Sequence, residues 1–242
     1  MWPVIENSIS EGQNALMKLK YAPFPVVAAP AGMALGGGCE IVLAAAAVQA
    51  HAESYMGLVE VGVGVIPGFG GCKELVIRAM MNKKRPGGAM PALSGVFEAI
   101  STAKVATSAA EARDMMILRE GDRVTMNRKR VLADAKKRAL EMVDGYAAPE
   151  PSEVNLPGAT AAAAFDMAVS GFVTMGRATA YDGVVSEQVA RVLTGGDTDI
   201  TQPVTEKKLL ELEREGFMTL IHNHKTLDRI EHMLTTGKPL RN

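Results

Sequence analysis

The sequence has little of what marks several classes of protein. Only 2 of its 242 residues are cysteine, and Cys39 and Cys72 show no metal-binding spacing, which argues against a disulfide scaffold and a zinc site. The 4 histidines form no ligand pattern. Lysine plus arginine (26) nearly balance aspartate plus glutamate (27), so there is no basic surplus for nucleic acid. No apolar run approaches the roughly 20 residues of a membrane span. We therefore expect no metal, nucleic acid or membrane as a partner.

The N-terminal region and the composition are typical of a soluble protein. Glu6 and Glu11 lie where a signal peptide would need an uninterrupted apolar run. The hydrophobic fraction of 48% is that of an ordinary globular chain, and the length is sufficient to bury a core. The sequence therefore predicts a cytoplasmic protein.

Hydrophobic periodicity and turn residues predict an α/β fold in two parts. Before residue 90, helices are expected at 4–19, 39–48 and 72–80, and strands at 26–29, 48–50 and 54–56. The loop over 82–91, with its Lys83-Lys84-Arg85 cluster, is the predicted boundary between domains 1–90 and 91–242. Beyond it we expect only helices, at 109–118, 123–144, 160–175, 181–193, 206–222 and 226–234. Ser108 and Glu111 have the spacing of a capping box.

The first of two glycine-rich turns is Gly36-Gly37-Gly38, directly before the helix that contains Glu40. Such a turn leaves backbone N–H groups unpaired at a helix start, where they can bind an anion or a carbonyl oxygen that gains charge. Glu40 follows Gly37 by about one helical turn, so its carboxylate can share the face on which these amides open. Taken alone, Glu40 is more simply a capping residue, and the glycines also permit tight packing.

Glu60 and the second turn change this balance. Glu60 is surrounded by Leu58, Val59 and Val61, and no cation is near it in sequence. Burial there would raise its pKa toward the range useful for proton transfer. The alternative is a glutamate that points out of a half-exposed strand edge. The turn at 68–71 offers a second set of open amides. Two open turns and two carboxylates suit chemistry that passes through an enolate.

The stretches PVVAAPAGMALGGGCEIVLAA and YMGLVEVGVGVIPGFGG closely resemble the enoyl-CoA hydratase (crotonase) superfamily. They are most similar to the hydratase module at the C-terminal end of fused 3-hydroxyacyl-CoA dehydrogenases. The ending KTLDRIEHMLTTGKPLRN also resembles the end of those proteins. The resemblance is dense over residues 11–80 and the last few dozen. It implies a partial crotonase-like ββα spiral core at 1–90 and an extended all-helical region at 91–242.

The resemblance also assigns roles. In that family the middle glycine of GGG supplies an oxyanion amide, which falls on Gly37, with Gly36 beside it. Two glutamates flank the water that is added, and they match Glu40 and Glu60, with Gly68 helping to hold the water. The implied reaction is hydration of trans-2-enoyl-CoA to 3-hydroxyacyl-CoA in fatty-acid β-oxidation. Coenzyme A enters only as part of the substrate, and no other cofactor is implied. Relatives that only shift the double bond typically keep the second glutamate alone, so the pair favours a hydratase over an isomerase.

Two further expectations concern the substrate pocket and the assembly. Met33 and Met56 lie near the expected pocket and could line it for an acyl chain. In the family a β-rich segment precedes the helix that matches residues 4–19, and it supplies a second oxyanion amide and much of the CoA pocket; this chain begins after it. The alternatives to an active hydratase are a truncated, non-catalytic acyl-CoA-binding or assembly subunit, and a helical protein whose glycine turns serve packing. We expect a homo-oligomer or a partner chain that supplies the missing segment.

Overall fold

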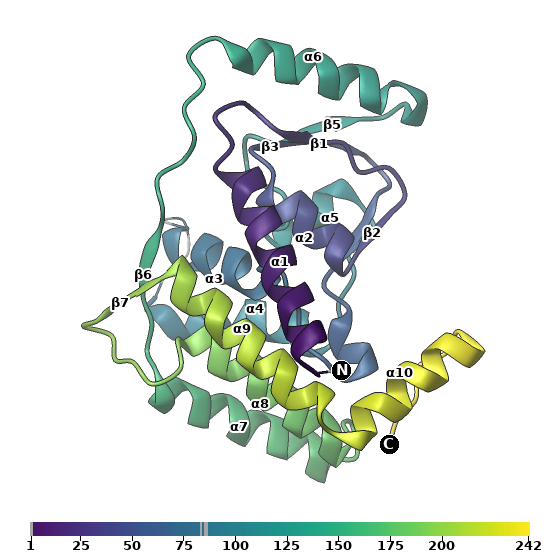
Figure 1. Ribbon diagram of the computed structural model, residues 1–242, viewed down its shortest axis with the longest axis vertical. Helices are drawn as coiled ribbons and strands as arrows, with labels where there is room; N and C mark the ends of the chain where they lie inside the picture. Colours follow the sequence, from purple (N-terminus) through teal and green to yellow (C-terminus); the bar gives the residue numbers. More distant parts are fainter. Residues whose placement is uncertain (1, 83, 85–86) are drawn as a thin grey trace.

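A computed structural model describes residues 2–82, 84 and 87–242, and it shows a mixed α/β fold in which helices predominate (Figure 1). The α-helices are α1 (Trp2–Lys20), α2 (Gly37–Ala44), α3 (Gly71–Met81), α4 (Ala89–Ser101), α5 (Ala109–Asp114), α6 (Val131–Val143), α7 (Ala159–Thr174), α8 (Ala180–Thr194), α9 (Glu206–Ile221) and α10 (His224–Thr236). The strands are β1 (Val27–Ala28), β2 (Met33–Leu35), β3 (Ala47–His51), β4 (Tyr55–Gly57), β5 (Arg123–Thr125), β6 (Glu153–Asn155) and β7 (Pro203–Thr205). Two 3-10 turns are η1 (Glu60–Val63) and η2 (Arg128–Arg130).

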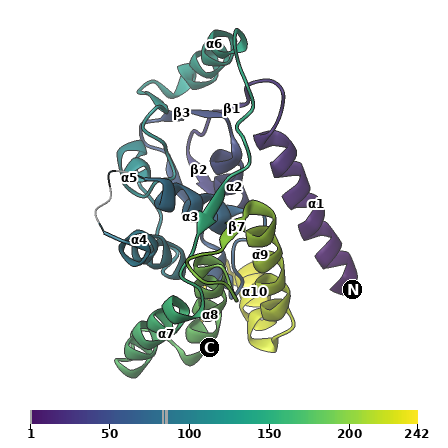
Figure 2. The same ribbon diagram turned by 90° about the vertical axis from the view of Figure 1, so that its left-hand side faces the viewer.

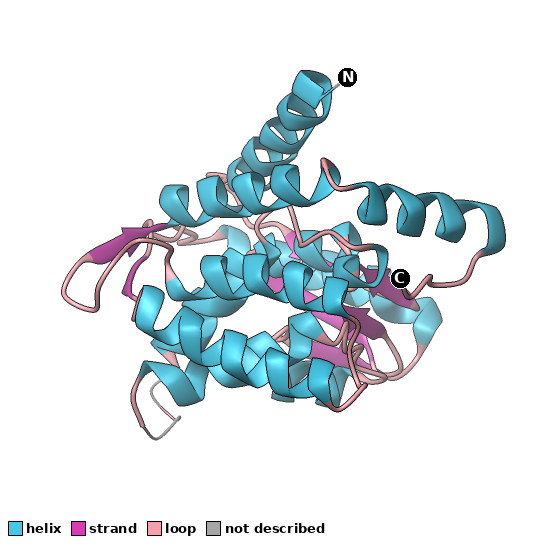
Figure 3. Cartoon of the chain, turned by 90° about the horizontal axis from the view of Figure 1, so that it is seen from below, coloured by secondary structure: helices cyan, strands magenta, loops and turns pink. Residues whose placement is uncertain are grey.

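The strands form small sheets that position the glycine turns. Strands β1, β3 and β5 form a parallel sheet in the order β1-β3-β5, and α6 lies against it at one end of the molecule (Figures 1 and 2). Strands β2 and β4 form a parallel pair that leads into α2 and η1, and β6 pairs with β7 antiparallel. Figure 3 shows these strands in separate groups among the helices. Strand β3 is buried at every position, as expected for the central strand of a covered parallel sheet.

One hydrophobic cluster joins the residues on both sides of the predicted boundary near residue 90. It includes Cys39 and Cys72 from the first part and Leu93, Leu193 and Leu209 from the second, all essentially inaccessible to solvent. Both cysteines are free and buried. Because α8 packs against α3, α4 and α9, the helices of the second part contact the elements that carry the second glycine turn. The division into two domains at residue 90 stays a prediction.

The predicted α/β class is confirmed, and most helices occur where the periodicity places them. The helix predicted over 123–144 is wrong in its first part, because β5 pairs there with β3 and α6 starts only at Val131. The helix predicted over 39–48 ends at Ala44, and β3 begins at Ala47. The region after residue 90 is mainly helical but not all-helical, since β5, β6 and β7 lie in it. In each case pairing with a distant strand outweighs local helix preference.

Two local predictions are corrected in detail. Ser108 caps α5 by accepting a hydrogen bond from the Glu111 N–H at 3.2 Å, but the Glu111 carboxylate accepts from the Thr107 N–H at 2.9 Å and not from Ser108. The loop predicted over 82–91 ends earlier, because α4 starts at Ala89. Residues 83, 85 and 86 of that loop, and so most of the basic cluster, lie outside the described residues.

Within the described ranges, none of the helices is both long enough and apolar enough to span a bilayer.

Candidate active site

The first glycine turn connects β2 to α2. Gly36 has φ 56°, a left-handed conformation that favours glycine, and its N–H donates to the Gly57 carbonyl at 2.9 Å. Helix α2 begins at Gly37, and the N–H groups of Gly37 and Gly38 have no hydrogen-bond partner in the part of the chain that is described. The first turn therefore presents the open amides that the sequence predicts, with the positive end of a helix dipole behind them.

Glu40 connects the two glycine turns. Its side chain is buried, and Oε1 accepts hydrogen bonds from the Phe69 N–H at 2.8 Å and the Gly71 N–H at 2.9 Å. Oε2 lies on the side of Gly37, since a Cβ atom placed on Gly37 would be 4.0 Å from it. Burial raises the pKa of Glu40, while the two amides and the charge of Lys73 lower it. One oxygen is thus fixed by backbone amides and the other remains on the side of the open turn.

The second glycine turn differs from the prediction of open amides. Besides the two N–H groups that bind Glu40, Gly70 donates to Oε2 of Glu213 at 2.7 Å and Lys73 donates to Oε1 of Glu213 at 2.7 Å. Two buried carboxylates therefore occupy the amides at the start of α3. The prediction of open amides was wrong because their acceptor, Glu213, belongs to α9 and lies 140 positions after Lys73, so no pattern near the turn indicated it.

Glu60 begins the 3-10 turn η1, next to the first glycine turn. Its Oε1 would lie 3.2 Å from a Cβ atom on Gly36, so the carboxyl group lies against the backbone of that turn. Its Oε2 is buried and has no hydrogen-bond partner among the described residues. Burial, followed by the negative charge of Glu40, raises the pKa of Glu60 to about 8. Glu60 is therefore mostly protonated at neutral pH.

The structure brings Gly36, Gly37, Glu40 and Glu60 together, and Gly68 lies at the start of the turn that holds Glu40. The carbonyl of Gly68 accepts a hydrogen bond from Nε2 of Gln13, on α1, at 2.9 Å, which fixes the orientation of this peptide.

The two predicted methionines differ in their exposure. Met33 is 81% exposed on β2, whereas Met56 is fully buried within the core on the adjacent strand β4. A role for either in binding an acyl chain stays a prediction.

Sequence reasoning missed two residues of this site. The Phe69 ring packs against α1, where a Cβ atom on Gly12 would come within 2.5 Å of it, and it also lies beside Gly37. Glu213 had a recognisable signal, because Leu209, Leu212 and Gly216 lie on the same face of α9 and are buried with it. A buried carboxylate on a largely apolar helix face indicates a specific partner, and Glu206 on the same face of α9 has one in Lys73.

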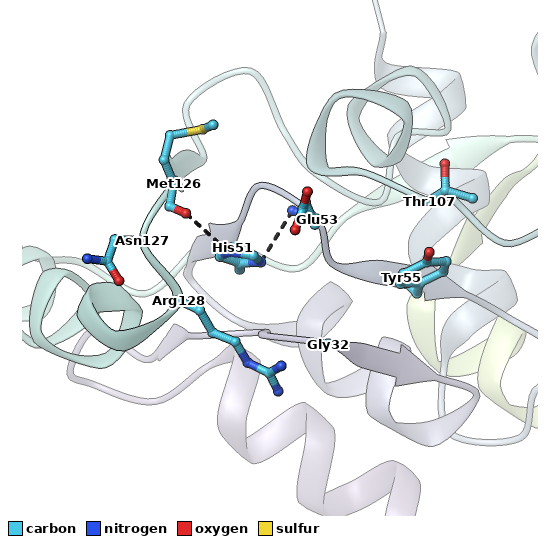
Figure 4. A pocket seen from close by; sticks show the side chains of 8 residues that line it. All are labelled: Gly32, His51, Glu53, Tyr55, Thr107, Met126, Asn127 and Arg128. Carbon is cyan, nitrogen blue, oxygen red and sulfur yellow. Dashed lines mark hydrogen bonds between the residues drawn. The ribbon is translucent and has the colours of Figure 1, made fainter.

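A separate groove of about 1000 Å³ opens at the carboxyl ends of β3 and β5 (Figure 4). The ring of His51 uses both nitrogens for local contacts, with the Met126 carbonyl at 3.2 Å and the Glu53 N–H at 3.3 Å. None of the predicted site residues lines this groove. Across the described residues, no group of three or more histidine, cysteine, aspartate or glutamate side chains could hold a metal ion.

Comparisons with known proteins identify similar sequences. Residues 6–85 match the family model described as enoyl-CoA hydratase/isomerase. A probable 3-hydroxyacyl-CoA dehydrogenase of Bacillus subtilis (strain 168) is 45% identical over 231 residues, which are 95% of this chain and 29% of that protein. A putative fatty acid oxidation complex trifunctional enzyme of Rickettsia felis is 28% identical over 227 residues, 94% of this chain and 28% of its own length. The chain thus spans less than a third of these relatives.

Solved structures show the same fold. A putative enoyl-CoA hydratase from Streptomyces avermitilis superposes with a TM-score of 0.55 at 19% identity, over 93% of this chain and 61% of that one. An enoyl-CoA hydratase from Mycobacterium avium subsp. paratuberculosis K-10 gives a TM-score of 0.59 at 18% identity, over 98% and 73%. These similarities confirm the crotonase-like fold predicted from the sequence.

Proposed function

We propose that this chain, whose residues 6–85 match the enoyl-CoA hydratase/isomerase family, belongs to that family and adds water to trans-2-enoyl-CoA thioesters to give 3-hydroxyacyl-CoA. The observation that supports this most is the pairing of Glu40 with Glu60 beside the open amides of Gly37 and Gly38. Two carboxyl groups in one site with different environments can serve as base and acid in a single reaction.

The two carboxyl groups differ in their hydrogen bonds. Burial raises the pKa of both, but backbone amides donate to Oε1 of Glu40 and favour its ionised form, whereas Oε2 of Glu60 has no partner among the described residues. We therefore assign Glu40 as the base that takes a proton from water. The pKa of Glu60 is about 8, so Glu60 carries a proton near neutral pH and is the acid. The unpartnered Oε2 of Glu60 is an atom from which a substrate carbon can receive that proton.

In the proposed reaction the water oxygen forms a bond to C3 while its proton passes to Glu40. The electron pair of the double bond moves toward the thioester carbonyl, whose oxygen gains negative charge at the Gly37 amide. Glu60 then protonates C2, and the product has gained H at C2 and OH at C3. Glu40 is left protonated and Glu60 ionised, and proton exchange with solvent restores both.

The test is turnover of crotonyl-CoA by the purified chain, followed by loss of the conjugated enoyl absorbance. Glu40→Gln and Glu60→Gln should each lower kcat by at least a hundredfold, because each removes one proton transfer. Glu98→Gln, an exposed site on α4, is the matched control and should retain the wild-type rate.

A second candidate function is acyl-CoA binding without turnover, as a subunit of a larger assembly. The observation that favours it is that Oε1 of Glu40 caps the start of α3 through the Phe69 and Gly71 amides, a role that needs no turnover. Calorimetric binding of crotonyl-CoA with no turnover at high protein concentration would support this alternative and contradict the hydratase proposal. If crotonyl-CoA neither binds nor turns over, both candidate functions are contradicted.

A further inference from the structure

Glu213 is a buried carboxylate that caps a helix from outside that helix. Helix α3 begins after Gly70, which has φ 112° and no side chain with which to cap it. Glu213, on α9, takes this place: its Oε2 accepts the Gly70 N–H and its Oε1 accepts the Lys73 N–H, both at 2.7 Å. The side chain is 0% exposed, so water does not compete for these amides.

The amides bound by Glu213 alternate with those bound by Glu40. Phe69 and Gly71 donate to Oε1 of Glu40, and the intervening Gly70 donates to Glu213. Adjacent peptides of the turn therefore point in opposite directions, one set toward α2 and the other toward α9. If Gly70 lost its acceptor, its peptide could rotate, and the two neighbouring N–H groups that hold Glu40 would move with it.

We propose that Glu213 is a positioning residue for the hydration reaction: it fixes the turn before α3 so that Oε1 of Glu40 is held by backbone amides and Oε2 stays on the side of Gly37. The kinetic part of this inference rests on the proposed function. Its structural part, the control of Glu40 by Glu213, does not depend on turnover.

The titration of Glu40 reports on this control. The charged or titratable groups that face it from the surrounding elements are Cys39 on α2, Glu60 on η1, Cys72 and Lys73 on α3, and Glu213 on α9. Among the influences that lower the pKa of Glu40, the amides of Gly71 and Phe69 come before the charge of Lys73. Weaker hydrogen bonds from these amides would therefore raise the pKa of Glu40.

The experiment replaces Glu213 by glutamine, which has the same size but can accept hydrogen bonds only at its oxygen. One of the Gly70 and Lys73 amides then loses its acceptor. We expect kcat for crotonyl-CoA to fall by roughly 10- to 100-fold with little change in KM, because a displacement of the base by about 1 Å costs a factor of that order. Glu211→Gln, on the same helix and paired with Lys208 at 4.0 Å, is the control and should change neither.

A measurement without turnover separates this inference from the proposed function. The carboxyl carbon of Glu40 is titrated by ¹³C NMR in wild type and in Glu213→Gln, with Glu40→Gln used to assign the signal. Because Glu213→Gln also removes a negative charge near Glu40, which by itself lowers the pKa of Glu40, Glu213→Asp, which keeps the charge but reaches the turn less far, is titrated beside it. A higher midpoint for Glu40 in Glu213→Asp supports the inference even if wild type shows no hydratase activity. A midpoint that is unchanged or lower in Glu213→Asp overturns it, whatever the rate, because Glu213 would then act only on stability. If Glu213→Asp does not fold, the same criterion is applied to Glu213→Gln.

Discussion

At the scale of single residues, glycines make room for the carboxyl groups of this site. A Cβ atom on Gly36 would lie 3.2 Å from Oε1 of Glu60, and one on Gly71 would lie 3.1 Å from Oε1 of Glu40. Both distances are tighter than ordinary van der Waals contact. The glycines therefore permit the close approach of carboxylate and backbone, in addition to the left-handed conformation that Gly36 requires.

The neighbouring glycines of the first turn should respond differently to alanine. Gly36→Ala places a side chain at φ 56° and against Glu60, so we expect a loss of about 1–2 kcal/mol in the free energy of unfolding and a lower hydration rate. Gly38→Ala is the matched control, because a Cβ atom there meets nothing within 4 Å and the residue lies within α2. It should be neutral or stabilising by up to about 1 kcal/mol. Urea denaturation measures both, and equal losses would contradict this account.

The pKa of Glu60 predicts an alkaline limit to activity. Because Glu60 must be protonated to act as the acid, kcat for crotonyl-CoA should decrease as the pH rises through about 8. The measurement is kcat from pH 6 to 9.5, at saturating substrate. A profile that stays flat across this range would exclude Glu60 as the proton donor.

The same pKa shift affects stability in a way that does not depend on turnover. The folded-state pKa of Glu60 is above the value of 4.5 for an unperturbed glutamate, so its contribution to stability is complete below pH 4.5 and is lost as the pH rises through about 8. Glu60→Gln should therefore flatten the decline of the free energy of unfolding between these pH values. Glu98→Gln, at an exposed site, should leave the slope unchanged. An unaltered slope in Glu60→Gln would mean that Glu60 is ionised in the folded protein.

At the scale of elements, α10 holds the turn that carries Glu60. The hydroxyl of Thr226 donates to the carbonyl of Gly64 at 2.6 Å, directly after η1, and it also forms a hydrogen bond with the hydroxyl of Tyr181 on α8 at 2.6 Å. Thr226 is fully buried, and Gly64 has φ 81°. The hydroxyl group of Thr226 therefore joins α10 to α8 and to Gly64, which lies four residues after Glu60.

Thr226→Val tests this contact, since valine has nearly the same shape and lacks the hydroxyl. The Gly64 carbonyl and the Tyr181 hydroxyl would each lose a partner in a buried environment, at a cost of about 1–3 kcal/mol. Thr235→Val, on the same helix but exposed and bonded only to carbonyls of its own helix, should cost far less. Comparison of the two by urea denaturation checks the prediction, which equal effects would contradict.

Local sequence patterns predicted what depends on neighbouring residues. The open amides before α2 follow from Gly36 to Gly38, and the raised pKa of Glu60 follows from the apolar residues around it. Neighbouring residues could not predict that amides of the second turn are occupied, because the partner of Gly70 and Lys73, Glu213, lies 140 or more residues away. Strand β5 was missed for the same reason: Arg123 to Thr125 are extended only because they pair with β3.

At the scale of the whole molecule, a buried group of charges joins α1, α3 and α9. The ammonium group of Lys73 contacts Glu74 at 2.5 Å and Glu206 at 3.0 Å, and Lys20 contacts the same two carboxylates at 2.8 and 3.0 Å. The Tyr21 hydroxyl also donates to Glu206 at 2.6 Å. Two positive and two negative charges thus balance at the point where the N-terminal helix meets the helical region.

Loss of one cation should destabilise the protein strongly. Lys73→Met keeps the length and the apolar stem of the side chain but leaves Glu74 and Glu206 with Lys20 as their remaining cation, both carboxylates being largely buried. We expect a loss of about 3–5 kcal/mol in the free energy of unfolding at pH 7. Lys207→Met, on the exposed face of α9, is the control and should change stability by less than about 0.5 kcal/mol.

The pH dependence of the unfolding free energy of wild type and Lys73→Met shows whether Lys73 stabilises the protein through its charge or through packing. The cations lower the pKa of Glu74 and hold that of Glu206 at about 2, below their unfolded values, so their contribution is present above pH 4.5 and is lost as the pH falls through about 2. The difference in unfolding free energy between wild type and Lys73→Met should therefore shrink as the pH is lowered from 5 toward 2. A difference that stays constant over this range would mean that Lys73 stabilises the junction of α1, α3 and α9 by packing alone.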